Sequence, residues 1–239
     1  MAAAMAVTSP RLVTSGYYRN NLYVLLGCNV LVTLVAWTAA PEAGLFVWPP
    51  LVASLLCYAG AVAWLYERPR AGIVLLTLVA GVTLAGCWLD TPSLTGVSMV
   101  RRLLGWLDPV GGGLVLGTTM AAMLLGHWYL NAPGMKLAPL GRLVLLMVAA
   151  VLLRAVLSGV GAGLEIASQG VPGLRWWFLL GLRWLSGLVG ALVVAAMAWQ
   201  TLKIPNTQSA TGILYVGVMT TFLGELTAQL LSQDAAFPL

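Results

Sequence analysis

Long apolar segments alternate with short polar breaks along the whole chain. Proline, glycine and charged residues mark the breaks, and the apolar segments run over residues 22–40, 46–66, 71–89, 111–130, 142–164, 176–200 and 208–231. Each is close to the length of about 20 residues with which an α-helix crosses the hydrocarbon core of a bilayer. The pattern predicts an all-α polytopic membrane helix bundle of about seven transmembrane helices. No internal repeat or low-complexity linker is visible, so we expect a single integral membrane domain over residues 1–239.

The composition supports a membrane protein. The chain is 60% hydrophobic and 8% charged, whereas a soluble domain carries about 25% charged residues. The net charge of +5 is therefore interpreted as a sign of membrane topology, not of nucleic-acid binding. The expected partners are membrane lipids and other membrane subunits. The three cysteines lie in apolar segments and show no disulfide or metal-ligand spacing.

The positions of lysine and arginine predict the orientation. With a cytoplasmic N-terminus, the inner side holds seven basic residues, namely Arg11, Arg19, Arg68, Arg70, Lys136, Arg142 and Lys203. The outer side then holds three, namely Arg101, Arg102 and Arg175. Basic residues collect on the cytoplasmic side, which favours N-in and C-out. We expect a multi-pass protein of the bacterial inner membrane with a short cytoplasmic N-terminal tail over residues 1–20.

The longest break, residues 90–110, is expected to be an outer interfacial loop. Its residues Val100, Leu103, Leu104 and Leu107 repeat at helical spacing, which favours a short helix lying on the membrane surface over a plain loop. The following residues, 108–113, contain one proline and three glycines and are expected to form a flexible entry to the fourth span.

Three ionisable residues inside the later spans, Arg154, Arg183 and Glu225, are the main candidates for a functional site. Charges at this depth are costly and mark function by default. Arg183 and Glu225 share helical faces with small residues, which line helix–helix contacts in membranes. At 1.5 Å per residue both lie about 10 Å below the outer boundary. We therefore expect an Arg183–Glu225 ion pair with Arg154 close by.

Two arginines and one glutamate leave one positive charge over. An unpaired buried charge is expensive, so the surplus predicts an anionic group beside Arg154 or Arg183, such as a lipid phosphate, a haem propionate or a substrate carboxylate. Alternatively, Glu165 turns inward and neutralises the second arginine, and the charges serve only helix packing. Proton or ion transfer is a third interpretation.

His127 is the only histidine of the chain. It shares a helical face with Met123 and Asn131, so these three residues are candidates for a quinone or haem contact. One histidine excludes bis-histidine haem ligation within one chain, and Met123 on the same helix cannot take the opposite axial position. An ordinary interfacial histidine is the simpler alternative. Haem and quinone are therefore the two candidate cofactors.

Two segments resemble other proteins: LLGHWYLNAPGMKLAPLGRL around the fourth span and IPNTQSATGILYVGVMTTFLGELTAQLL over the seventh. They resemble stretches of uncharacterised bacterial multi-pass membrane proteins, which implies no activity. Seven spans with an inward glutamate are also similar to subunit III of haem-copper oxidases. The histidine-rich segments of that family are lacking here, so this likeness concerns topology alone.

The function expected from these features is that of a non-catalytic subunit or accessory protein. It would belong to an energy-transducing complex of respiratory or photosynthetic electron transport and bind lipid, quinone or a haem or pigment group between its helices. The alternative is a carrier for a small anionic solute that uses Arg154 and Arg183. An intramembrane enzyme is disfavoured because no nucleophile–base pair is visible.

The charge bias yields a test of orientation. Reporter domains fused to the two ends of the chain should report a cytoplasmic N-terminus and an external C-terminus, because seven basic residues lie on one side and three on the other. Activity of an external reporter at the N-terminus, or of the same reporter at both ends, would contradict this orientation.

Overall fold

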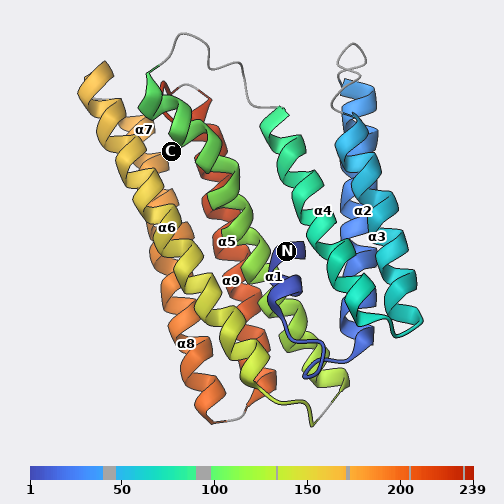
Figure 1. The fold of residues 1–239 in the computed structure, drawn as a ribbon. Coiled ribbons are helices and arrows are strands. Elements are labelled where there is room, and N and C mark those ends of the chain that lie inside the picture. Colours follow the sequence, from blue (N-terminus) through green and yellow to red (C-terminus); the bar gives the residue numbers. More distant parts are fainter. Residues whose placement is uncertain (40–46, 90–97, 133, 171–172, 205, 234) are drawn as a thin grey trace. The chain divides into compact units, whose positions relative to one another are not determined.

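The computed structural model describes residues 1–39, 47–89, 98–132, 134–170, 173–204, 206–233 and 235–239 (Figure 1). Its elements are helical throughout the described residues. Seven helices are long and apolar enough to cross a membrane, as the sequence predicts. The spans are α2 (Ser15–Ala39), α3 (Trp48–Leu65), α4 (Pro69–Leu89), α5 (Met99–Asn131), α6 (Ala138–Gln169), a composite sixth span, and α9 (Thr207–Ser232). The sixth span consists of α7 (Leu174–Leu182), the π-helical segment η2 (Arg183–Gly190) and α8 (Ala191–Lys203).

Contacts divide the chain into two compact units, residues 1–92 and 93–239. In the first unit, α3 packs against both α2 and α4. Its core includes an aromatic stack in which the rings of Tyr18 and Trp64 lie 4.0 Å apart and nearly parallel. Asn21 and Asn29 are buried and donate to carbonyls of their own helix, so apolar and aromatic packing holds this unit together.

The N-terminal residues differ from the expected tail. Residues Ala2–Val7 form a short helix, α1, which packs against α4 and buries Ala2, Ala4 and Met5. The Tyr18 hydroxyl donates to the carbonyl of Thr8 at 2.8 Å and fixes the turn that follows α1. Apolar side chains in the first residues explain the difference, because they gain more by covering the helices than by staying in water.

In the second unit, four spans form a closed ring. Helix α5 packs against α6 and α9, and α8 packs against the same two helices. Helices η2 and α9 approach each other backbone to backbone: a Cβ built on Gly187 would lie 2.5 Å from the Cα of Gly224. Small residues at such a crossing let two membrane helices approach backbone to backbone, as the small faces of the sixth and seventh spans predict.

The sequence predicts a short interfacial helix within residues 90–110 that a flexible segment separates from the fourth span. For residues 99–113 this prediction is wrong. Helix α5 runs without interruption over 33 residues, with Pro109 inside it, and Ser98 caps its start by accepting from the amide of Arg101. Part of the expected loop, 90–97, lies outside the described residues. Proline and glycine are tolerated inside a membrane helix because neighbouring helices satisfy and cover the backbone.

Candidate functional site

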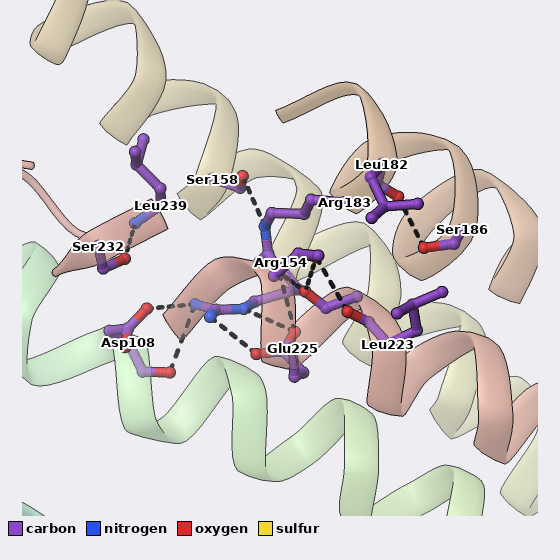
Figure 2. Close-up of polar contacts among 12 residues, drawn as sticks. Asp108, Arg154, Ser158, Leu182, Arg183, Ser186, Leu223, Glu225, Ser232 and Leu239 are labelled. Atoms are coloured by element: carbon purple, nitrogen blue, oxygen red, sulfur yellow. Dashed lines mark hydrogen bonds and ion pairs between the residues drawn. The ribbon is translucent and has the colours of Figure 1, made fainter. Parts of the chain in front are cut away.

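Four charged side chains meet inside the second unit, and each comes from a different span. They are Asp108 of α5, Arg154 of α6, Arg183 of η2 and Glu225 of α9 (Figure 2). We call these four residues the charged network. Both arginine side chains are almost completely buried, with exposed fractions of 1% and 0%. The network therefore connects every span of this unit at one level.

Arg154 is held by two carboxylates. Its Nε donates to Glu225 Oε1 at 3.1 Å and its Nη2 to Glu225 Oε2 at 2.9 Å, a bidentate pair. Its Nη1 donates to Asp108 Oδ1 at 2.5 Å. The two parallel bonds to Glu225 match the fork geometry in which guanidinium binds carboxylate most strongly. All three nitrogens of Arg154 are thus engaged by the protein itself.

Arg183 occupies the other side of Glu225, which confirms the predicted ion pair. Its Nη1 lies 3.4 Å from Glu225 Oε1 and donates to the carbonyl of Gly224 at 2.9 Å. Its Nε donates to the hydroxyl of Ser158 at 3.1 Å. Its buried Nη2 has no hydrogen-bond acceptor among the described residues. Arg183 is also the first residue of the π-helical segment, a local widening that often occurs at functional sites.

The predicted surplus of positive charge is wrong for the described residues, because Asp108 supplies a second carboxylate. With all four groups ionised, two positive charges face two negative ones. The alternative neutraliser, Glu165, is engaged elsewhere: its Oε2 accepts from the amides of Ala236 and Phe237 at 2.9 and 3.0 Å. The binding of an anionic group by Arg154, Arg183 and Glu225 stays a prediction. An uncompensated positive charge no longer supports it.

Two glycines of α5 give the network its space. A Cβ on Gly112 would lie 2.8 Å from Glu225 Oε2, and one on Gly111 would lie 3.2 Å from Arg154 Cδ. A Cβ on the neighbouring Gly113 would meet nothing within 4 Å. Gly111 and Gly112 therefore leave room on α5 for the side chains of Arg154 and Glu225 to lie against its backbone. The flexible entry expected from the sequence for residues 108–113 is instead part of a continuous helix.

The second group of candidate residues is only partly brought together. His127 and Asn131 are exposed on α5, whereas Met123 is buried with an exposed fraction of 6%. The nearest polar partner of His127 is Tyr215 of α9, whose hydroxyl lies 3.5 Å from His127 Nδ1. The structure thus presents a histidine–tyrosine pair on the outer surface of the helices. Contact of His127, Met123 and Asn131 with quinone or haem stays a prediction.

Sequence reasoning missed Asp108 and Tyr215. Pro109 and the three glycines after it predict a flexible segment, so the pattern places Asp108 outside the spans. A usable signal was present: Leu104, Asp108, Gly111 and Val115 repeat at intervals of four, three and four, which places them on one helical face. Three of these four residues are buried in the structure. Tyr215 has no comparable signal, since a tyrosine in an apolar span is common.

The described residues contain no group of three or more His, Cys, Asp or Glu side chains that could hold a metal ion. Comparisons with known protein families, with curated proteins and with solved structures found no match for this chain. Each charged group of the network is bonded to a group on another span, so the network links the four spans of the second unit to one another.

Loss of the central carboxylate should unfold the second unit more easily. Glu225→Gln removes the partner that both arginines share, and breaking a buried ion pair costs about 3–5 kcal/mol. Glu67→Gln, at an exposed position in the turn after α3, should change stability by less than about 0.5 kcal/mol. Thermal unfolding in detergent measures both variants, and equal midpoints would contradict the central role of Glu225.

The glycine surface of α5 provides a second, closely matched test. Gly112→Ala should displace the Glu225 carboxylate and destabilise the protein by about 1–3 kcal/mol, the usual cost of overpacking. Gly113→Ala should be neutral or stabilising by up to about 1 kcal/mol, because alanine favours a helix and nothing lies near. The same unfolding assay applies, and a Gly112→Ala midpoint at or above that of Gly113→Ala would refute the predicted packing.

Proposed function

We propose that this protein is a non-catalytic integral membrane subunit of an energy-transducing complex in the bacterial inner membrane, and that it binds lipid or quinone on its helix surfaces. The observation that carries the proposal is the closed charged network. Arg154 donates from every nitrogen to Asp108 and Glu225, so the charges that would otherwise mark a substrate site are used to assemble four spans.

The surfaces of the helices support a role in association. Helices α2 and α4 leave most of their residues exposed. In the most apolar 18-residue stretch of each helix, 17% of the residues are buried within the protein. Large side chains such as Leu31, Leu34 and Trp37 are more than half exposed. In a membrane these faces contact lipid or the helices of other subunits.

The pair of His127 and Tyr215 supports the quinone part of the proposal. Both side chains can donate a hydrogen bond, and a quinone carbonyl accepts one. They lie on the surface, where a lipid-soluble headgroup has access. A haem or pigment between the helices has no comparable support in the contacts of the described residues.

The second candidate function, a carrier for a small anion, has one observation in its favour. The buried Nη2 of Arg183 lacks an acceptor among the described residues and would suit one oxygen of an anion. Arg154, the other residue of that hypothesis, is fully engaged. The geometry therefore favours the subunit over the carrier.

Purification and reconstitution of the same protein discriminate between these functions. A tagged chain extracted from its native membrane in mild detergent should migrate as an assembly well above its 25.2 kDa and retain quinone, detected in the lipid extract. His127→Leu should lower quinone retention, whereas Tyr58→Leu, at an exposed position of α3, should not. A monomer without quinone that carries chloride or phosphate into liposomes would establish the carrier instead.

A further inference from the structure

The structure contains a surface groove between α6 and α8 that is separate from the charged network. Its volume is about 350 Å³, within the range of about 300–1,000 Å³ that small-molecule sites occupy. Its walls are apolar and consist of Val144, Leu145 and Val148 of α6 and Leu192, Ala195 and Ala196 of α8. The alanines leave the hollow, since larger side chains at these positions would fill it.

One end of the groove is polar. Trp199, Gln200 and Lys203 lie there, in the last turns of α8. All three are exposed, and among the described residues Lys203 forms no ion pair. The ring of Trp199 lies over Gly141 of α6, whose built Cβ would be 3.4 Å from it, and this contact closes the polar end against the neighbouring helix.

The order of these groups along the helices matches an amphiphile. Residues 192–196 lie toward the middle of the sixth span, and residues 199–203 lie at its inner end. On the antiparallel α6, exposed Arg142 lies just before the apolar wall that begins at Val144. Apolar surface thus lies toward the bilayer centre, with amide and ammonium groups at the boundary, as in a lipid with its chain inward and its headgroup at the surface.

The charge of the polar end selects among lipids. Lys203 lies on the predicted cytoplasmic side, where the leaflet contains anionic lipids, and basic pockets between helices on that side bind anionic headgroups. Tryptophan at this level is a common interfacial anchor. A zwitterionic lipid would place a second positive group beside Lys203 and lose part of the attraction.

We propose that the α6–α8 groove binds an anionic phospholipid, with an acyl chain along Val144–Val148 and Ala195–Ala196 and the phosphate at Lys203 and Gln200. The site makes the lipid-binding part of the proposed function specific and rests on that part alone. Lipid binding in this groove requires neither partner subunits nor quinone. If the groove binds no lipid, the subunit hypothesis is not affected, and if the protein forms no larger assembly, the lipid proposal is not affected.

A second groove in the first unit has the same order of groups. It has a volume of about 340 Å³, is lined by Ala59, Val62 and Ala63 of α3 and by Ala71 of α4, and includes Tyr66 and Arg68 of the turn between them. Arg68 lies on the predicted cytoplasmic side as well. Each unit thus has an apolar groove with an aromatic and a basic residue at its predicted cytoplasmic end, which supports a preference of such grooves for anionic lipid.

Native mass spectrometry of the full chain in detergent, with added dioleoyl phosphatidylglycerol or dioleoyl phosphatidylcholine, tests the headgroup contact. The wild type should retain more of the anionic lipid. Lys203→Gln should weaken that retention about fivefold, since one basic residue near an anionic surface contributes about 1 kcal/mol. Lys136→Gln, an exposed lysine on the same predicted side and outside the groove, should leave it unchanged.

A larger side chain that fills the groove tests whether an acyl chain binds there. Ala196→Phe should reduce retention of both lipids, whereas Val193→Phe, at an exposed position of α8 outside the groove, should not. Equal retention of the two lipids by the wild type, unchanged retention in Lys203→Gln, or unchanged retention in Ala196→Phe would each overturn the proposal.

Discussion

The contact between Glu225 and two arginines is the interaction on which the second unit depends. A charge in hydrocarbon is expensive unless a partner and hydrogen bonds compensate it. Arg154 and Arg183 come from different spans, and neither can reach Glu225 unless α6 and η2 are correctly placed against α9. The network therefore selects one register among many that apolar packing alone would permit.

Other features of this unit follow from that constraint. Gly111 and Gly112 leave α5 without side chains where the charged groups pass, and Gly187 and Gly224 let η2 and α9 approach closely beside Arg183. Asp108 completes the charge balance from the fourth span. Each small residue costs helix propensity, and close packing around the network compensates for that cost.

The two units are stabilised by different means. The first unit has an aromatic stack and buried asparagines that bond within their own helix. These two asparagines therefore connect no two spans, unlike the charged side chains of the second unit. In the second unit, the charged side chains lie at contacts between helices, whereas the α6–α8 groove and the pair of His127 and Tyr215 lie on the outer surface. The charged side chains of this unit thus point toward one another between the spans, and the polar groups on its outer surface are the ones that the proposed lipid and quinone contacts use.

The sequence by itself determined the class, the seven spans and the pairing of Arg183 with Glu225. Apolar length and small-residue faces are local and periodic, and depth follows from counting residues along a helix. Only the tertiary structure decided the partner of Arg154 and the role of residues 108–113. Proline and glycine there weaken a helix in isolation, and neighbouring helices restored it by covering its backbone. The charge balance depends on that one element, because the helix brings Asp108 to Arg154 as the second carboxylate of the network.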